Sequence, residues 1–535
     1  MKKFITTPIY YVNDIPHIGH AYCTLAADTL ARYWKKKLGK ENVFFLTGTD
    51  ENSQKTVDAA ALAGLEIPEY LEGMAKTWKE TWEKCGIEFD DFIRTTEDRH
   101  KKTVHEILTT IHDKGDIYKG KYEGLYCTGC EAFLKSSDLD EKGNCPHHRT
   151  PPQKVEEENY FFRLKNYQQK LLELFEKNPN ILEPEKRRNE ILSFIKSGLE
   201  DISISRENAE FGIPLPWDES HNIYVWFDAP IEYIACAQEW VDAGKGDDWA
   251  RWWRTDKGAQ DVRYTQFMGK DNVPFHTLSF PATIIGSGEP WKRVDYLKSF
   301  NYLNYDGGQF STSRGRGVFM DQALEILPAD YWRWWLLSRA PQTSDSEFTW
   351  DAFQTDTNKD LNDVLGNFVS RVTKFCRSKF SEEVPAGGEW GEAEATLIAD
   401  LQTRLTAYQA AMDGIEVRKA AAELRAMWAA GNEYLQAAAP WTVFKTDPDQ
   451  AAAQIRLALN LIRIYAVLSA PFIPTASAKL LSAMNTLDMA WPDDMAAAVQ
   501  ALPAGHAFSV PENLFRKITD DERAEWAERF AGVRD

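Results

Sequence analysis

The 535 residues are too many for a single hydrophobic core, so we expect three or more domains. With 43% hydrophobic and 13% aromatic residues the chain has a globular composition, and no run reaches the roughly 18 apolar residues of a membrane span. The net charge of −19 argues against indiscriminate binding to nucleic acids. It leaves room for a nucleic-acid partner that is held by local basic patches.

The N-terminus and the cysteines together predict a cytoplasmic location. The chain enters a strand that ends at Pro8, without an apolar or Arg-rich leader. Of the seven cysteines four are scattered and three are clustered, which does not form a disulfide framework and suits a reducing compartment.

Two histidines lie where the first predicted strand, 3–7, gives way to a predicted helix, 21–37. In His17-Ile18-Gly19-His20 the imidazoles and the free N–H groups of a helix N-terminus are suited to phosphate oxygens. Gly19 lets a flat ligand lie against the backbone. The alternative is a pair of ordinary loop histidines.

Residues 1 to about 118 alternate between strands and helices, which predicts a parallel α/β sheet. The buried strand 42–46 leads to Thr47-Gly48-Thr49-Asp50. Ligands bind at the carboxyl ends of such strands, so we expect Asp50, just past its strand, to lie near the histidines. The alternative for Asp50 is a helix N-cap.

A second pattern begins at Lys119 and contains Cys127-x-x-Cys130 and Cys145-Pro146-His147-His148. Thiolates and imidazole are the ligands of a tetrahedral Cys₃His zinc site. His148 is favoured over His147 as the fourth ligand because it repeats the spacing of the first knuckle. Four protein ligands leave no open position, so we expect a structural zinc ion in this insertion.

The α/β pattern resumes at 223–230 and continues to 266–272. A strand that runs into Gly269-Lys270-Asp271 places a cation and a carboxylate at the edge of the sheet. Lys270 is suited to phosphate and Asp271 to ribose hydroxyls; the alternative is a pair of surface charges. The following segment, 302–317, has the Gly-rich, hydroxyl-rich and basic composition of a mobile loop that contacts phosphate, with a solvated hairpin tip as the alternative.

From Asp360 the chain is predicted to be helical, with apolar residues at helical spacing from Leu361 to Cys376. Asn367 and Arg371 share one flank of this helix. Arg463 and the prolines that follow argue against a membrane span at 457–468. The tail, 512–535, is expected to form one more polar helix.

Taken together, these features resemble the methionyl-tRNA synthetases of class I over essentially the whole chain. The motifs that carry the resemblance are His17-Ile18-Gly19-His20, Thr49-Asp50-Glu51, the two Cys/His knuckles, 225–230, Gly269-Lys270-Asp271 with Phe275-His276, and 367–371 with Pro440-Trp441. The resemblance implies a Rossmann-type parallel-sheet catalytic domain with a zinc-binding insertion, followed by an all-α helical-bundle anticodon-binding domain. The expected divisions are 1–118 and 223–295 for the catalytic halves, 119–222 for the insertion, 296–358 for the loop region, 359–510 for the bundle and 511–535 for the tail.

The resemblance implies that the chain activates L-methionine with ATP and transfers it to the 3′-terminal adenosine of initiator and elongator tRNA(Met). ATP, with Mg²⁺, would meet His17, Gly19, His20, Gly269, Lys270, Asp271, Ser311, Thr312, Ser313 and Arg314. Methionine would meet Ile9, Tyr11, Asp50, Trp226, Ala229, Pro230, Tyr233, His276 and Phe280. Asp50 would bind the α-ammonium group of methionine. The tRNA anticodon would contact Asn367, Arg371 and Trp441. The zinc ligands would be Cys127, Cys130, Cys145 and His148.

One loop departs from the family's pattern. The family's Lys-Met-Ser-Lys-Ser is Gln309-Phe310-Ser311-Thr312-Ser313 here, so both lysines are missing. We expect Arg314 to neutralise the negative charge of pyrophosphate in place of these lysines, with Arg316 and Lys298 as alternatives. Smaller departures are Asn52-Ser53, where relatives usually carry His-Gly, and Asn272, where an apolar residue is common.

Four other functions fit the sequence less well. A synthetase for valine, isoleucine or leucine would carry a much longer editing insertion, and a cysteine-specific relative would place zinc in the amino-acid site. A tRNA-free nucleotidyltransferase would not need the helical domain. A non-catalytic paralogue that binds tRNA or protein is suggested only by the missing loop lysines. Many relatives dimerise through a further C-terminal domain. This chain stops soon after the helical bundle, so we expect a monomer.

Overall fold

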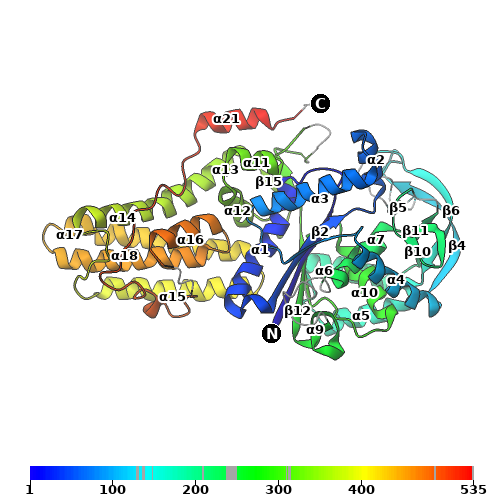
Figure 1. Ribbon diagram of the computed structural model, residues 1–535, viewed down its shortest axis with the longest axis horizontal. Coiled ribbons are helices and arrows are strands. Elements are labelled where there is room, and N and C mark those ends of the chain that lie inside the picture. The colour runs from blue at the N-terminus through cyan, green and yellow to red at the C-terminus, as the bar shows by residue number, and fades with distance from the viewer. Residues whose placement is uncertain are drawn as a thin grey trace. The chain divides into compact units, whose positions relative to one another are not determined.

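The computed structural model describes residues 1–535 except 128–131, 135, 137–138, 147–148, 208–209, 237–249, 309, 311–314, 487–489 and 533–535. The described part of the chain divides into two compact units (Figure 1). Unit 1 comprises Met1–Pro16, Lys40–Trp82 and Phe89–Asn301, and unit 2 comprises His17–Gly39, Glu83–Glu88 and Tyr302–Asp535. His17 and His20 therefore belong to unit 2 and Asp50 to unit 1, so their proximity stays a prediction.

Unit 1 is built around a parallel sheet. Within the described residues, six strands pair in the order β3-β2-β1-β12-β13-β7. Their bounds are β1 Lys2–Tyr11, β2 Val43–Asp50, β3 Asp91–Arg94, β7 Leu182–Glu183, β12 Val262–Gly269 and β13 Tyr296–Phe300. The strand order reverses between β1 and β12, and ligands of such sheets bind outside the carboxyl ends of the strands at this point. The prediction of a Rossmann-type sheet with strands from both halves of the catalytic domain is thereby confirmed.

The first two strands are longer than predicted. Pro8 has no N–H to give to a neighbour, and the register of β1 against β2 shifts between Thr6 and Ile9, but the strand continues to Tyr11. Gly48, which follows the predicted strand 42–46, lies inside β2, and a Cβ at Gly48 would collide with the backbone of Ile93 on β3. Asp50 is therefore the last residue of its strand and does not lie beyond it.

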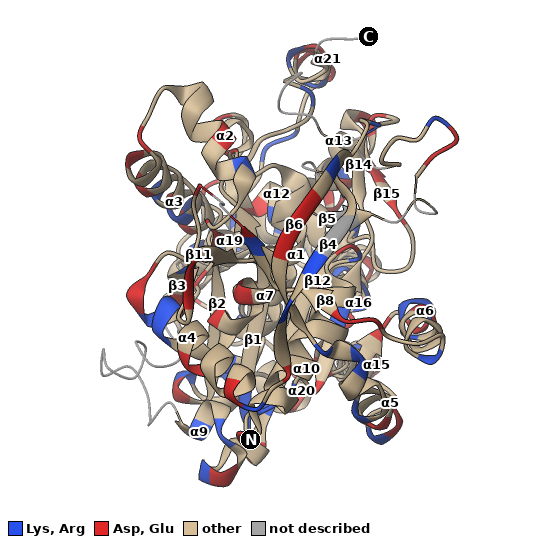
Figure 2. Cartoon of the chain, turned by 90° about the vertical axis from the view of Figure 1, so that its right-hand side faces the viewer, with Lys and Arg blue, Asp and Glu red and all other residues tan. Residues whose placement is uncertain are grey.

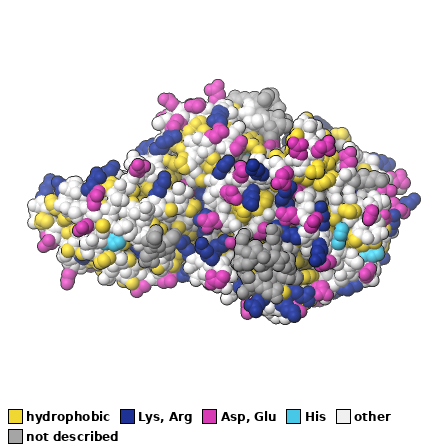
Figure 3. Space-filling view, viewed as in Figure 1, with side chains coloured by type: hydrophobic (Ala, Val, Ile, Leu, Met, Phe, Trp, Pro, Cys, Tyr) yellow, Lys and Arg dark blue, Asp and Glu magenta, His cyan; other side chains and the backbone are white. Residues whose placement is uncertain are grey.

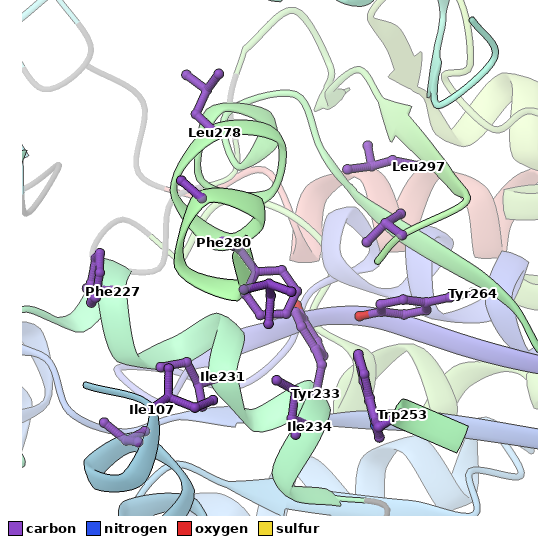
Figure 4. Close-up of a cluster of buried hydrophobic side chains, with 14 of the residues drawn as sticks. Ile107, Phe227, Ile231, Tyr233, Ile234, Trp253, Tyr264, Leu278, Phe280 and Leu297 are labelled. Carbon is purple, nitrogen blue, oxygen red and sulfur yellow. The ribbon is translucent and has the colours of Figure 1, made fainter. Parts of the chain in front are cut away.

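Helices pack against this sheet and enclose a large hydrophobic cluster, part of which is drawn in Figure 4. The helices of the sheet region are α2 Gln54–Ala63, α3 Ile67–Lys84, α4 Asp98–Asp113, α5 Gln168–Lys177, α6 Glu185–Lys196, α7 Val225–Asp228, α9 Ala250–Trp253 and α10 Phe280–Ser287. The ring of Tyr264 on β12 packs against Phe4 on β1 and Trp253 on α9. The cluster thus joins the two predicted halves of the catalytic domain.

The predicted insertion forms antiparallel sheets. One has the order β5-β4-β6-β8, with β4 Ile117–Cys127, β5 Ala132–Leu134, β6 Gln153–Phe162 and β8 Ile202–Ser203. The other has the order β10-β11-β9, with β9 Ser205–Glu207, β10 Pro214–Leu215 and β11 Asp218–Ile223. The acidic run on β6 stands out in Figure 2, and Glu158 within it pairs with Lys119 on β4 at 3.4 Å. The insertion also supplies β7 to the parallel sheet, which its local sequence did not indicate.

Unit 2 is mainly helical. Its long helices α14, α15, α16 and α18 run alongside one another in Figure 1. The helices are α1 Ile18–Leu38, α11 Met320–Ile326, α12 Ala329–Ser338, α13 Trp350–Thr357, α14 Asn367–Lys379, α15 Glu392–Asp413, α16 Val417–Ala438, α17 Pro440–Val443, α18 Pro448–Ser469, α19 Pro474–Ala483, α20 Met495–Ala498 and α21 Asp520–Arg529. The unit also contains a short parallel pair of strands, β14 Leu303–Tyr305 and β15 Ser346–Phe348.

Two helices differ from the prediction. The helix expected from Leu361 begins as a π-helical segment, Asn358–Gly366, before α14, and the side chain of Asn432 donates to the carbonyl of Val364 there. The predicted tail helix is confined to α21, because a capping box between Thr519 and Glu522 starts it late. Apolar spacing alone does not reveal either feature.

Helix α18 is the one described helix that is long and apolar enough to cross a membrane, and 94% of its apolar window is buried within the protein. A core helix of the bundle has the same composition. On the face shown in Figure 3, acidic and basic side chains are intermixed and apolar side chains are scattered between them.

A buried ion pair holds unit 2 together. Arg333 is 1% exposed and donates to Asp28 Oδ2 at 2.6 Å and to the carbonyls of Pro471 and Phe472. Burial alone would raise the pKa of Asp28, but the guanidinium groups of Arg32 and Arg333 outweigh it and hold that pKa below its ordinary value. The carboxylate therefore stabilises the fold at neutral pH, and this contribution is lost as the pH falls through the lowered pKa.

Replacement of Asp28 by Asn is expected to lower the free energy of unfolding by about 3–5 kcal/mol, because Arg333 is left buried beside a neutral group. Chemical denaturation at neutral pH measures this change. The matched control is Glu325→Gln, which removes the exposed partner of Arg529 and is expected to cost at most about 1 kcal/mol. Equal losses for the two variants would contradict the prediction.

Candidate active site

The two histidines of the first motif cap helix α1. His17 is the N-cap residue, and its Nδ1 accepts a hydrogen bond from the N–H of Gly19 at 3.0 Å. The N–H of His17 in turn donates to Nδ1 of His20 at 3.3 Å. Because each Nδ1 is an acceptor, each neutral ring carries its proton on Nε2. The capping box thus engages the Nδ1 atoms of both rings, and an Nε2–H group is a suitable donor for an anionic ligand.

Both imidazoles are neutral at physiological pH. Burial lowers the pKa of His20 to about 4, and burial together with the neighbouring His20 lowers the pKa of His17 well below its ordinary value. The rings stack with centroids 3.8 Å apart. These residues can therefore stabilise phosphate through N–H dipoles and not through positive charge.

The ring of Phe310 lies over the same motif. It stacks on the ring of His17 with centroids 4.4 Å apart and planes 6° apart, and a Cβ at Gly19 would lie 3.3 Å from Phe310 Cε2. The flat surface that we predicted for a ligand at Gly19 is thus in contact with Phe310. The predicted loop residues Gln309, Ser311, Thr312, Ser313 and Arg314 lie outside the described residues.

The two alternatives to Arg314 are engaged elsewhere. Lys298 is 4% exposed and pairs with Glu183 at 2.9 Å. Arg316 donates to the carbonyls of Tyr305 and Asp306 at 3.0 and 2.8 Å. The assignment of Arg314 as the cation for pyrophosphate stays a prediction.

In unit 1, Asp50 ends strand β2 and is 3% exposed. Tyr11 pairs with it in register on β1 and contacts the ring of Trp226 edge-on at 5.8 Å. The cap of the next helix, α2, is Ser53, which accepts from the N–H of Thr56. The N-cap alternative for Asp50 is therefore wrong. A carboxylate buried to this degree is suited to a cationic ligand group.

An apolar and aromatic wall of unit 1 contains the other predicted methionine residues. Trp226 on α7 stacks on Phe275 at 4.1 Å, and Tyr233 lies edge-on to Phe280 at 5.9 Å (Figure 4). Ile9 lies on β1 in a pair with Gly48, and Ala229 and Pro230 form the turn that follows α7.

One hydrogen-bond chain orders this wall. Nδ1 of His276 donates to the carbonyl of Asn272 at 2.9 Å, so Nε2 is the acceptor for the hydroxyl of Tyr233 at 3.0 Å. Burial lowers the pKa of His276 to about 4. This pair is therefore neutral, and the backbone carbonyl of Asn272 accepts a hydrogen bond from it.

Lys270 and Asp271 lie where predicted, directly after β12. Asp271 folds back over Gly269, because a Cβ there would be 2.7 Å from Asp271 Oδ1. The side chain of Asp271 is exposed and that of Lys270 is half-buried.

Sequence reasoning missed Glu232, which precedes Tyr233. Glu232 is fully buried, and neither of its carboxyl oxygens has a hydrogen-bond partner within the described residues. Burial, and next the charge of Asp50, raises its pKa well above the ordinary value. A protonated Glu232 adds no second negative charge to that of Asp50. Its position in an apolar run was the only sequence signal.

The predicted anticodon residues lie in unit 2. Asn367 begins α14 and is exposed, and Arg371 follows it by one turn. The guanidinium of Arg371 lies 4.4 Å from the ring centroid of Trp441. Trp441 is the second residue of α17, and the residue before that helix, Ala439, has a left-handed backbone conformation. The structure thus brings Arg371 and Trp441 together.

Two of the four predicted zinc ligands are described. Cys127 ends β4 opposite Ala132 on β5, and Cys145 is closed into a turn because its carbonyl accepts from the N–H of Arg149 at 2.7 Å. Both thiols are buried, which suits zinc ligands. Cys130 and His148 lie outside the described residues, and within those residues no other His, Cys, Asp or Glu group is arranged for a metal.

A parallel sheet with a switch point, two neutral histidines at a helix N-terminus and a separate helical bundle agree with the expected class, the class I tRNA synthetases. A family model described as "tRNA synthetases class I (M)" matches residues 3–155 and 148–373, and one described as "Anticodon binding domain of methionyl tRNA ligase" matches residues 384–535. Asn367 and Arg371 fall within the first match and Trp441 within the second.

Full-length relatives agree with these matches. The chain is 53% identical to the methionine–tRNA ligase of Ruegeria pomeroyi and 51% identical to that of Dinoroseobacter shibae, with 100% of each chain covered. Its fold resembles that of the Mycobacterium tuberculosis methionyl-tRNA synthetase in complex with methionyl-adenylate, with a TM-score of 0.87 and 30% identity over 96% of this chain and 100% of that one. The chain belongs to the methionine–tRNA ligase family and is an aminoacyl-tRNA ligase. The non-catalytic alternative is not supported.

Proposed function

We propose that the methionine–tRNA ligase reaction of this chain is carried out by the residues described above. The observation that carries the proposal is the buried carboxylate Asp50, which has Tyr11 opposite it on β1. Asp50 holds the α-ammonium group of methionine. The α-carboxylate is already ionised at neutral pH, so its attack on the α-phosphate of ATP needs alignment and charge stabilisation and no general base.

Two kinds of group bind the ATP phosphates: neutral hydrogen-bond donors and positively charged side chains. The Nε2–H groups of His17 and His20 donate hydrogen bonds, and Lys270 supplies a positive charge. Arg314 takes the place of the family's loop lysines. Mg²⁺, when bound with ATP, neutralises phosphate charge. Gly19, Gly269, Asp271 and Ser311 to Ser313 complete the nucleotide contacts.

The side chain of methionine lies against Ile9, Trp226, Ala229, Pro230, Tyr233, His276 and Phe280. Aromatic rings favour a polarizable thioether, and the neutral Tyr233–His276 pair can face sulfur without placing a charge beside it. Such a pocket distinguishes side chains that differ by one methylene by only about 1–3 kcal/mol.

The tRNA partner is tRNA(Met), both initiator and elongator. Trp441 stacks an unstacked anticodon base, and Arg371 and Asn367 read base edges. The contact between Arg371 and Trp441 supports this role because it presents a guanidinium and a ring on one surface.

In the insertion, Cys127, Cys130, Cys145 and His148 hold one structural zinc ion, which the two buried thiols support. Zinc would crosslink the knuckles, and no step of the reaction uses it. The protein is a cytoplasmic monomer.

Methionine-dependent ATP–pyrophosphate exchange tests the proposal together with the altered loop. We expect exchange with the wild-type chain, and a loss of about a hundredfold in turnover for Arg314→Ala, because one donor to transition-state charge is removed. Arg316→Ala is the control and should stay within a few-fold of wild type. Wild-type exchange by Arg314→Ala would assign the pyrophosphate charge to another residue.

A further inference from the structure

Three buried side chains of unit 1 form a polar cluster that no predicted site residue belongs to. Oδ2 of Asp228 accepts from Nδ2 of Asn52 at 3.1 Å and lies 3.2 Å from Nε2 of His100. Asp228 and His100 are fully buried and Asn52 is 7% exposed. We call these three residues the Asp228 cluster.

Each member of the cluster comes from a different segment. Asn52 follows Asp50 by two residues, His100 lies in α4, and Asp228 lies between Trp226 and Ala229. The cluster therefore joins the end of β2, where the ammonium group of methionine is proposed to bind, to the wall of the side-chain pocket.

The segment that carries Asn52 is itself held firmly. The other hydrogen of its amide donates to the carbonyl of Thr95 at 3.3 Å, and the N–H of Glu51 donates to Thr95 Oγ1 at 2.9 Å. Arg94 donates to the buried carboxylate of Glu51 at 2.8 Å. Glu51 and Asn52, which follow Asp50 directly, are thus fixed to β3 and to the residue after it, and Asn52 links this segment to Asp228.

At Trp226 the wall is held less directionally than at the hydrogen-bonded pair of Tyr233 and His276. Trp226 contacts Phe275 and Tyr11 through ring faces and edges, which tolerate sliding. The hydrogen bonds to Asp228 are directional, and within the described residues Oδ1 of Asp228 has no hydrogen-bond partner. Asn52 and His100 therefore determine where this carboxyl group, and the wall attached to it, can lie.

We propose that Asn52 is a positioning residue for methionine, which acts through Asp228 to set the distance between Asp50 and the wall formed by Trp226, Ala229 and Pro230. The proposal rests on the roles proposed above for Asp50 and the wall. It assigns a function to Asn52, one of the chain's departures from its family. Removal of its amide N–H is expected to weaken methionine binding and to leave ATP binding unchanged.

The test is Asn52→Asp, which is isosteric and replaces the donor by a carboxyl group that faces Asp228. In pyrophosphate exchange at neutral pH we expect the KM for methionine to rise about tenfold or more, while the KM for ATP stays within about twofold. The control is Gln54→Glu, the same amide-to-carboxyl change at an exposed side chain of the same segment, which should change neither KM.

His100 provides a second pair of variants in case Asn52→Asp does not fold. His100→Gln keeps a donor for Asp228 and should retain the methionine KM within about threefold, whereas His100→Leu should raise it as Asn52→Asp does. An unchanged methionine KM, or an equal rise of both KM values, would overturn the proposal. Failure of Asp50 to bind methionine would instead appear as a wild-type methionine KM in Asp50→Asn.

Discussion

Asp50→Asn is expected to lower kcat/KM for methionine by about a hundredfold to a thousandfold, the largest effect of any single substitution in unit 1. The carboxylate is buried at the end of β2, so an ammonium group that binds there is desolvated as well. Removal of one partner from a buried ion pair costs about 3–5 kcal/mol. Each 1.4 kcal/mol corresponds to about a factor of ten in an equilibrium or rate ratio.

Pyrophosphate exchange at varied methionine concentration measures this loss, and the KM for ATP serves as an internal reference. The matched control is Asp58→Asn, which makes the same change at an exposed carboxylate on α2. Asp58→Asn should behave as the wild type. An Asp50→Asn variant with a wild-type kcat/KM for methionine would show that another group holds the ammonium.

The second large effect is expected for His20→Ala, which should lower the turnover of pyrophosphate exchange by about a hundredfold or more. The substitution removes one Nε2–H donor and also the acceptor of the His17 N–H, so the capping box that orients His17 is lost. Because the loop has no lysines, we expect the histidines and Lys270 to carry a larger share of phosphate stabilisation. The substitution should therefore lower kcat and raise the KM for ATP, and it should change the KM for methionine little.

The pKa of His20 supplies a further check on the same reaction. Because that pKa is lowered to about 4, the ring stays neutral above pH 6, and protonation of His20 should not limit the rate between about pH 6 and 8. His105→Ala is the control for loss of a histidine outside the site. Wild-type turnover by His20→Ala would contradict the role assigned to the capping histidines.

Several features of the site could be predicted from the sequence because they depend on neighbours along the chain. A strand that runs into His17-Ile18-Gly19-His20 and then a helix needs only local patterning to be recognised, and the same holds for Lys270 directly after β12. The zinc knuckles were also inferred from spacing, and the zinc site stays a prediction. The end of β2 was placed too early because the apolar run ends at Leu46, whereas pairing with β1 and β3 continues the strand to Asp50.

By itself the sequence determined the class of fold and the order of the motifs, and it predicted which side chains bind substrate, because these follow from local periodicity and from residue types at short spacing. Only the tertiary structure decided the environment of those groups. It showed the neutral tautomers of His17 and His20, the stacked Phe310 and the cluster around Asp228. Burial and contacts between segments far apart in the chain control these properties, and a linear pattern carries no measure of either.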